Sequence, residues 1–198
     1  MKLLNFKINL TIYNKYNMKK SLILITTLLS LSAFSPPECK YKVNTFDPAT
    51  NTVVKETEKQ LITTRNTAKK DVLVAVGIRN GNDIVFNLGL TVLSDRSLDA
   101  VITTTNKVDI TLENDSVVTM YPKSKVKPVL FASKAGVNFQ YGFDIFYQVN
   151  PQHLHQLTTY NVKKIAVYYT NNEQLYVSTS EIKDKYTSAI KNVMSCVM

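Results

Sequence analysis

Residues 139–149 read Phe-Gln-Tyr-Gly-Phe-Asp-Ile-Phe-Tyr-Gln-Val and carry the clearest structural pattern of the chain. The intervening positions are mostly polar, and Phe146 is the apolar exception. Because successive side chains of a strand point to opposite faces, this period of two predicts an antiparallel strand with one buried face and one wet face. The predicted buried face consists of Phe139, Tyr141, Phe143, Ile145, Tyr147 and Val149.

The same rhythm extends outward from this strand, with interruptions, from residue 40 to residue 178. Turn residues separate the alternating runs, which therefore predict a series of hairpins. Asn80-Gly81 is the strongest turn signal, because both residues tolerate the positive φ of a type I′ turn. The predicted hairpins join 40–46 to 52–60, 71–78 to 84–93, 107–112 to 117–121 and 162–169 to 174–179, with a short apolar piece at 128–133.

Two helices are predicted in the C-terminal part of the chain. Asn150 can cap a short helix in which Pro151 occupies the first turn, where its missing N–H costs no hydrogen bond. A second helix is expected over 181–194, capped by Ser178 or Ser180, because apolar residues recur there at helical spacing. The predicted fold is therefore mainly β (α+β), an antiparallel β-sandwich or β-roll with a C-terminal helix packed on it. A β-barrel with an interior ligand cavity is the alternative.

The N-terminal part has the three-part layout of a secretory signal peptide. Two lysines precede an uncharged apolar run over 21–33, and small residues and two prolines follow it. This run is shorter than the roughly 20 residues that a membrane-spanning helix needs. The expected boundaries are a start-site misassignment over 1–17, a signal peptide over 18–35, and a single β-rich domain over 36–198.

Cysteine usage agrees with export. Cys39 and Cys196 lie near opposite ends of the expected mature chain. In an oxidising compartment we expect them to form a disulfide, and the alternative is a pair of free thiols in flexible ends. The bridge requires the two termini of the domain to meet, which is common. The expected location is therefore the periplasm or the medium.

Most of the formal net charge of +9 comes from the residues that precede the expected domain, because residues 1–35 hold five lysines and no acidic residue. The remainder has 19 basic groups against 15 acidic groups. That balance is an ordinary solubilising charge and not the footprint of a nucleic-acid-binding protein. Nucleic acid is therefore not an expected partner.

Catalytic and metal motifs are absent from the sequence. His153 and His155 are the only histidines, and on a helix they point about 200° apart, so they cannot share one metal ion. No nucleophile elbow, phosphate-cradling loop or dinucleotide fingerprint occurs. Asp109, Glu113 and Asp144 are interpreted as ordinary surface acids. We therefore assign no catalytic residue, no metal site and no cofactor.

Candidate binding residues fall into two groups. Lys123, Lys125 and Lys127 alternate between two prolines, so in an extended segment their ammonium groups would project to one side. This pattern favours protection of an edge strand, and the alternative is contact with an anionic surface or an acidic glycan. Tyrosines that combine an apolar ring with a polar tip can line a ligand pocket or simply fill the core. The candidates are Tyr141, Tyr147, Tyr168, Tyr169 and Tyr176.

The order of segments from Cys39 to Val197 also invites comparison. The chain opens with Cys-Lys-Tyr-Lys-Val-Asn at 39–44, continues with Ile-Thr-Leu-Glu-Asn-Asp-Ser-Val-Val at 110–118, and closes with Val-Lys-Lys-Ile-Ala-Val-Tyr-Tyr-Thr at 162–170, a helix and Cys196-Val197. This order resembles small exported proteins of unassigned function from Bacteroidetes-type bacteria. The resemblance implies a periplasmic or secreted location and transfers no activity and no site residue.

We therefore expect an exported non-catalytic module that binds a partner, a surface polymer or a small ligand, as a monomer or a weak oligomer. A small extracytoplasmic hydrolase is the first alternative, and two convergent carboxylates in a deep pocket would favour it. A lipid-carrying β-barrel is the second alternative, and it requires an empty apolar interior.

Overall fold

The computed structural model of the protein describes residues 38–64, 72–94, 98–134 and 138–198, whose strands form two antiparallel sheets. Sheet A contains β1 (Tyr41–Asp47), β2 (Thr52–Thr57), β3 (Gln60–Thr64), β4 (Val72–Asn80), β5 (Asp83–Ser94), β9 (Val129–Lys134) and β10 (Asn138–Gln148). Sheet B contains β6 (Ala100–Val101), β7 (Val108–Leu112), β8 (Val117–Met120), β11 (Val162–Asn171) and β12 (Gln174–Glu181).

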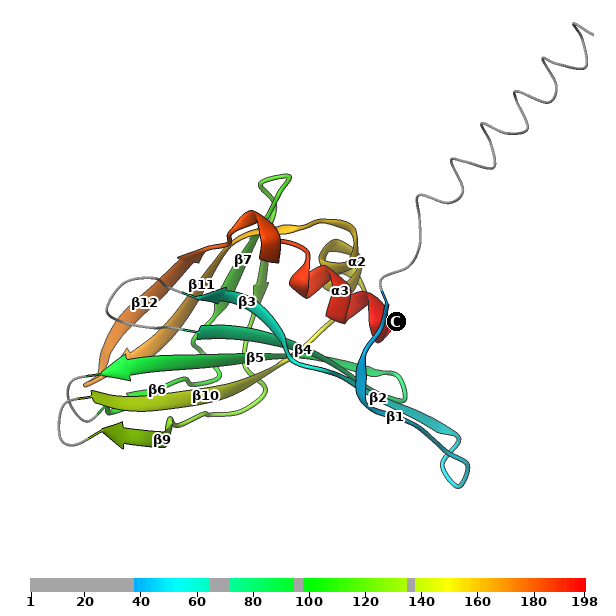
Figure 1. Cartoon of the computed structure of the whole chain (residues 1–198), viewed down its shortest axis with the longest axis horizontal. Helices are drawn as coiled ribbons and strands as arrows, with labels where there is room; N and C mark the ends of the chain where they lie inside the picture. Colours follow the sequence, from blue (N-terminus) through cyan, green and yellow to red (C-terminus); the bar gives the residue numbers. More distant parts are fainter. Residues whose placement is uncertain (1–37, 65–71, 95–97, 135–137) are drawn as a thin grey trace, which may run out of the picture. The chain divides into compact units, whose positions relative to one another are not determined.

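The strand orders are β1-β2-β4-β5-β10-β9 in sheet A, where β3 also pairs with β4, and β12-β11-β7-β8 in sheet B, where β6 also pairs with β11. Figure 1 shows β5, β10 and β9 on one side and β11 and β12 on the other. The predicted β-sandwich with a C-terminal helix is confirmed. The alternation in the strands gives each sheet an apolar face, and the two apolar faces pack together.

The core lies between the two sheets. On its inner face β10 places Tyr147, Ile145 and Phe143 opposite Phe86, Leu88 and Leu90 of β5. These side chains are buried together with the inward residues of β7 and β11 in one hydrophobic cluster. The buried residues that sheet B contributes from β7 and β11 are Val108, Ile110, Leu112, Val162, Ile165 and Val167.

The first helix forms as predicted. α2 (Pro151–Thr159) begins after Asn150, whose side-chain oxygen accepts a 2.7 Å hydrogen bond from the backbone N–H of His153. This bond satisfies one of the free N–H groups of the first turn. Leu157 is the fully buried residue of the helix.

The second helix begins later than predicted. β12 continues to Glu181, a 3₁₀ turn follows at Asp184–Tyr186, and α3 covers Ala189–Cys196. The predicted caps Ser178 and Ser180 pair with β11 instead, so this boundary was wrong. Apolar spacing could not reveal it, because pairing with β11 is a long-range contact that overrides a local helical pattern.

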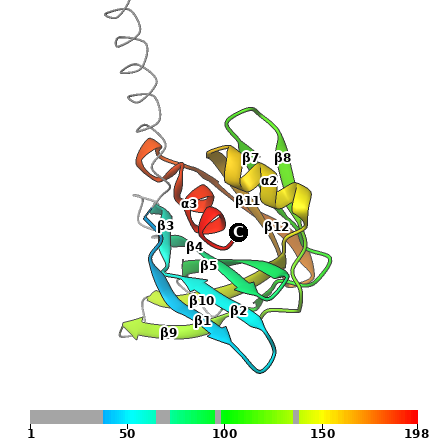
Figure 2. The same ribbon diagram turned by 90° about the vertical axis from the view of Figure 1, so that its right-hand side faces the viewer.

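α3 lies between the sheets and packs against β3, β4 and β11, and α2 packs beside it (Figure 2). A Cβ placed on Gly77 of β4 would collide with the backbone carbonyl oxygen of Val193 in α3. Glycine at position 77 therefore sets how closely the helix approaches sheet A.

Other local predictions need smaller corrections. The turn between β4 and β5 is formed by Gly81, at φ +60°, and Asn82 rather than by Asn80 and Gly81. The predicted strand over 52–60 is divided into β2 and β3, and β6 was not predicted because two residues carry no readable alternation.

The expected segments 1–17 and 18–35 lie outside the described residues. Within the ranges that are described, no helix is long and apolar enough to cross a membrane.

Candidate functional site

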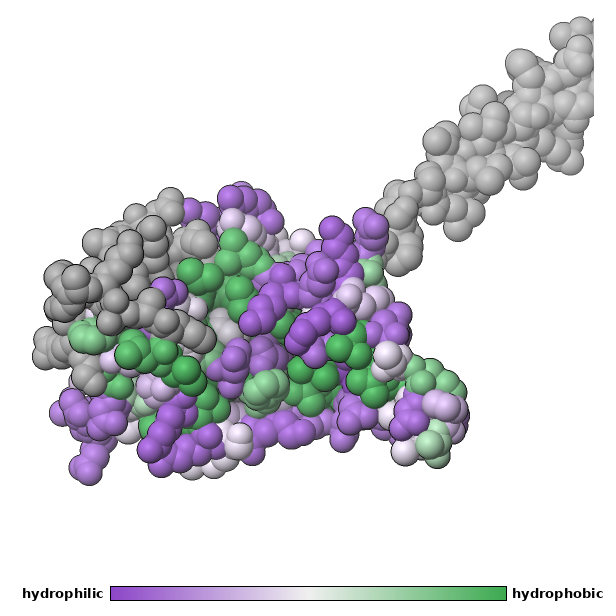
Figure 3. All heavy atoms as spheres, turned by 60° about the horizontal axis from the view of Figure 1, so that its bottom comes forward, coloured by the Kyte–Doolittle hydropathy of each residue, from purple (hydrophilic) through white to green (hydrophobic). Residues whose placement is uncertain are grey.

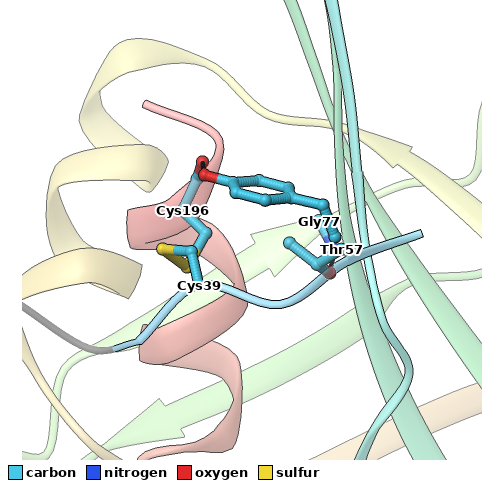
Figure 4. Close-up of a disulfide and its surroundings, with 5 residues drawn as sticks. Cys39, Thr57, Gly77 and Cys196 are labelled. Carbon is cyan, nitrogen blue, oxygen red and sulfur yellow. Dashed lines mark hydrogen bonds between the residues drawn. A yellow bond between two sulfur atoms is a disulfide. The ribbon is translucent and has the colours of Figure 1, made fainter. Parts of the chain in front are cut away.

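The predicted disulfide is present between Cys39, just before β1, and Cys196, the last residue of α3 (Figure 4). The two Cα atoms are 5.6 Å apart, a usual distance for a bridged pair. The hydroxyl of Tyr41 donates a 2.9 Å hydrogen bond to the carbonyl oxygen of Cys196, and the N–H of Gly77 donates to Thr57 Oγ1 at 3.0 Å. The disulfide and the Tyr41 bond tie the first strand to the last helix, and the Gly77 bond ties β4 to β2, so this end of the sandwich is structural.

Two of the predicted ligand-binding tyrosines belong to the core. Tyr141 and Tyr147 are 7% and 0% exposed on the inner face of β10. The Tyr147 ring stacks on Phe86 with its centroid 6.2 Å away. Burial raises the pKa of Tyr147, whose hydroxyl has no hydrogen-bond partner among the described residues. Neither tyrosine is therefore placed to meet a ligand from solvent.

A small apolar cavity lies between the sheets near the β11–β12 hairpin. Its volume is about 60 Å³, which admits water molecules but is far below the several hundred Å³ of typical ligand pockets. Tyr169 lines the cavity, and its ring stacks on that of Tyr176, with centroids 5.7 Å apart. The remaining lining residues are Leu90, Val92, Leu98, Ala100, Ile102, Phe143 and Ser178. This cavity has no room for a lipid chain.

The lysine segment is not extended along its whole length. It bends at residues 123–124, between a bridge from Pro122 to Tyr147 and a bridge from Val126 to Ile102. As a result Lys123 and Lys125 line two different grooves. These two ammonium groups therefore do not lie in the single stripe that an extended segment would produce, and neither groove includes Lys127.

The first groove is an open depression of about 420 Å³ on sheet A. Its lining residues are Ile78, Asn80, Asp83, Val85, Lys123, Ser124 and Phe146. Figure 3, in which the lower side of Figure 1 comes forward, shows that apolar residues on this side gather in patches separated by polar ones. This side of the domain is therefore mixed rather than continuously apolar.

The second groove is an open depression of about 450 Å³ on sheet B, lined by Asp99, Val101, Lys125, Thr170, Asn172 and Glu173. Val101 pairs with Thr170. Their sequence neighbours Ala100, Ile102 and Tyr169 line the internal cavity, so the side chains of Val101 and Thr170 point to the opposite face. The groove therefore lies on the outer face of sheet B. Two carboxylates, one ammonium group, an amide and a hydroxyl give it mixed charge and both donors and acceptors.

Next to this groove Tyr168 carries an aromatic ring on the same face of β11. It is two residues from Thr170, about 7 Å along the strand. Its ring lies 4.8 Å from Lys107 Nζ, measured to the ring centroid, which is a cation–π geometry. The backbone N–H of Tyr168 also donates to the carbonyl oxygen of Lys107 at 3.0 Å.

Asp109 forms the polar centre of this face. Lys107 Nζ lies 2.6 Å from one carboxylate oxygen, Thr119 Oγ1 donates to the other at 2.7 Å, and the side chain of Tyr168 is a third donor. Burial alone would raise the pKa of Asp109, but these donors outweigh it and hold the pKa below its ordinary value. The hydrogen bond to Asp109 likewise raises the pKa of Lys107. Asp109 is therefore a fixed acceptor on the surface.

Exposed apolar side chains surround this centre. Val108 pairs with Met120 at the end of the β7–β8 ladder, so Lys107 and Tyr121 follow just beyond it. Tyr121 is 55% exposed, and Val177, opposite Tyr168, is 51% exposed. We call the groove on sheet B, together with Lys107, Asp109, Thr119, Tyr121, Tyr168 and Val177, the sheet-B face.

Only part of the sheet-B face coincides with the binding residues predicted from the sequence. Tyr168 and Lys125 were predicted as binding residues, and Asp109 was interpreted as an ordinary surface acid. Tyr121, Lys107 and the groove acids were missed. Alternation within 107–121 could have placed Lys107 with Asp109, but the pairing of β7 with β11 is what brings Tyr168 beside them.

Groups suited to metal chemistry are not apparent in the described part of the chain. There, no cluster of three or more histidine, cysteine, aspartate or glutamate side chains is placed to hold a metal ion. His153 and His155 lie on α2, and burial lowers the pKa of His153.

Comparison with known proteins finds no match: no family model, no curated protein and no solved structure matches the chain. β-Sandwiches carry many unrelated functions, so the fold alone assigns none. Function is therefore inferred from the chemistry of the sheet-B face.

Proposed function

We propose that the protein is an exported, non-catalytic binding module whose sheet-B face recognises a hydroxyl-rich surface polymer, namely a glycan. The supporting observation is the juxtaposition of a mixed donor and acceptor groove with an oriented Asp109–Lys107 pair and exposed tyrosine. Carbohydrates present hydroxyl groups that need such donors and acceptors, and apolar C–H faces that pack on aromatic rings.

The charges of the groove favour a neutral ligand over an anionic one. Lys125 shares the groove with Asp99 and Glu173, and Lys107 is paired with Asp109. A polyanion would meet two carboxylates and one ammonium group in the groove, so one negative charge is unbalanced there, which is unfavourable. This argument favours a neutral glycan over the anionic surface that the lysine pattern alone suggested.

Export is part of the proposal. The disulfide links Cys39 with Cys196, and disulfides persist in oxidising compartments such as the periplasm or the medium. The signal-peptide pattern over 18–35 points the same way. A binding module at the cell surface or beyond it would meet glycans there, as the resemblance to small exported proteins also suggests.

A small hydrolase is the second candidate. The observation that favours it is the presence of two carboxylates, Asp99 and Glu173, in the same groove. Glycoside hydrolysis commonly uses such a pair, one residue as the acid and the other as the base or nucleophile. The groove is open and shallow, so we rank this candidate below binding.

The test is titration of the purified exported protein, by calorimetry, with a neutral β-glucan, a mannan and polygalacturonate at equal ionic strength. We expect a neutral polymer to bind, and Tyr121→Ala to weaken that binding about tenfold, equivalent to 1.4 kcal/mol. Phe46→Ala is the matched control, because Phe46 is also an exposed aromatic residue, 57% exposed, in β1 of the other sheet.

Three outcomes separate the candidates. Binding that is lost in Tyr121→Ala and kept in Phe46→Ala supports the sheet-B face as a binding site. Absence of binding to all three polymers, or equal loss in both variants, contradicts it. Release of shorter oligosaccharides, detected by mass spectrometry and abolished in Asp99→Asn and Glu173→Gln, would establish the hydrolase instead.

A further inference from the structure

The outer edge of sheet B is open at β12. Within the described ranges β12 pairs only with β11, over all eight of its residues and without a register shift. The turn residues Asn172 and Glu173 have positive φ, and Asn171 pairs with Gln174. In such a two-residue hairpin the backbone groups of Gln174 point toward β11, and those of every second residue point away. The N–H and C=O groups that face the open edge therefore belong to Leu175, Val177, Thr179 and Glu181.

β12 lacks the devices that usually protect an edge. Exposed edge strands commonly carry lysine, proline, a bulge or very few residues. β1 carries an exposed Lys42 and a register shift, β9 follows Pro128 and pairs through another register shift, and β8 has four residues. β12 has none of these, and its Leu175, Tyr176 and Val177 are 67%, 40% and 51% exposed.

We propose that β12 pairs with β12 of a second copy of this chain, which forms an antiparallel dimer with one continuous sheet. A two-fold axis perpendicular to the sheet keeps every side chain on its own face. Such an axis passes between one residue of β12 and the same residue of the second copy, so that residue pairs with itself. The central residues of the strand are Val177 and Ser178. Placing the axis at one or the other gives the two registers that pair the most residues.

Charge selects between these registers. With the axis at Val177, the turn residue Glu173 comes near Glu181 of the second copy, and neighbouring like charges are destabilising. With the axis at Ser178, Glu173 instead comes near Lys183 of the second copy, and this contact occurs twice in the dimer. The backbone of Lys183 is extended, at φ −70° and ψ 146°, so it continues the line of β12. The register centred on Ser178 is therefore complementary.

The register centred on Ser178 also satisfies the open backbone groups. Val177 lies opposite Thr179 of the second copy, and Leu175 lies opposite Glu181, so residues whose N–H and C=O groups face the edge meet each other. Because the axis is perpendicular to the sheet, both sheet-B faces lie on the same side of the dimer. A dimer would thus present the proposed glycan-binding face twice, but the pairing does not depend on that function.

The first test is sedimentation equilibrium of the purified exported protein over a range of concentrations. We expect a reversible dimer, and Thr179→Pro should weaken the association at least about tenfold. Thr179 directs its N–H away from β11, so proline removes no bond of the β11–β12 ladder, and thermal unfolding checks that the fold persists. A native protein that stays monomeric at every concentration overturns the proposal.

The second test fixes the register. Ser178→Cys should form a dimer linked by a disulfide under mild oxidation, because residue 178 faces itself across the axis. Ser180→Cys is the matched control. In this register residue 180 is four positions along the strand from residue 180 of the second copy, so the two cysteines should not cross-link. Lys183→Glu should weaken the dimer, and Glu173→Lys combined with Lys183→Glu should restore it. Equal cross-linking of both cysteine variants, or no restoration by the charge swap, contradicts the register.

Discussion

The two ends of the sandwich differ in how completely they are closed. At the disulfide end, α3 is packed against Gly77, Cys39 is bonded to Cys196, and Val193, Met194 and Val197 are wholly buried. At the hairpin end, between β11 and β12, there are an internal cavity of about 60 Å³, an open groove and exposed apolar side chains. The covalent bridge and the closely packed helix are thus at one end, while the groups suited to recognition gather at the other.

The largest effect should come from opening the disulfide end. Replacing Cys39 and Cys196 together by serine releases a loop with a sequence separation of 157 residues. We expect this change to lower the free energy of unfolding by about 2 to 5 kcal/mol, because a long loop gains much chain entropy in the unfolded state. The measurement is urea unfolding of the exported protein.

The same double variant sharpens the comparison between the two ends. Polymer binding and dimerisation, measured well below the unfolding midpoint, should remain unchanged because both depend on the hairpin end. An unaltered unfolding curve would show that the bridge contributes little, and loss of binding in a folded variant would show that the two ends are coupled.

A smaller loss should follow from Gly77→Ala. The added Cβ meets a backbone carbonyl oxygen of α3, which can move only if the helix shifts. Overpacking of this kind costs about 1 to 3 kcal/mol, measured by thermal or urea unfolding.

Gly89→Ala is the matched control for this substitution. Its Cβ would approach Val74 Cγ2 to 2.6 Å, but a side-chain methyl group can rotate away. A loss in Gly89→Ala as large as that in Gly77→Ala would mean that strand entropy, and not the approach of the helix, determines the effect.

The smallest effect should be the pH dependence that Asp109, at the hairpin end, adds to the free energy of unfolding. Its folded pKa is depressed, so its contribution is fully present above the unfolded pKa and is lost as the pH falls through the folded pKa. Asp109→Asn should therefore lower stability at pH 7 by about 1 kcal/mol or less and leave stability at pH 2 nearly unchanged. Urea unfolding at both pH values measures this difference.

Asp115→Asn is the control for the charge change alone. Asp115 forms an exposed ion pair with Lys163, and its side chain is 76% exposed. Such pairs contribute little, so its stability should match that of the native protein at both pH values. A loss in Asp109→Asn that persists at pH 2 would indicate a packing effect instead.

Features that depend on local sequence could be predicted, and features that depend on contacts between distant residues could not. The strand around 139–149 and the hairpins could be predicted because alternation and turn chemistry are local consequences of sequence. Asn150 and Pro151 likewise started α2 where they should. The boundary between β12 and α3 could not be predicted, because Ser178 and Ser180 pair with β11 instead of capping a helix, and a 3₁₀ turn separates β12 from α3.

The candidate site was less predictable than the fold. Tyr168 and Tyr169 are neighbours in sequence but face opposite sides of sheet B, one beside Asp109 and the other in the internal cavity. Tyrosine content could not separate these roles. Tyr121 carries no motif, and only its place next to Lys107, just beyond the end of the β7–β8 ladder, makes it part of the sheet-B face.

The sequence by itself determined that this chain forms antiparallel strands with a buried face, because side-chain polarity alternates at a period of two. It predicted the bridge between its two cysteines but left free thiols as an alternative, which the structure resolved. Only the tertiary structure decided which strands are neighbours. Strand pairing joins residues far apart in the chain, and it placed Asp109, Thr119 and Tyr168 together and left the edge of β12 open.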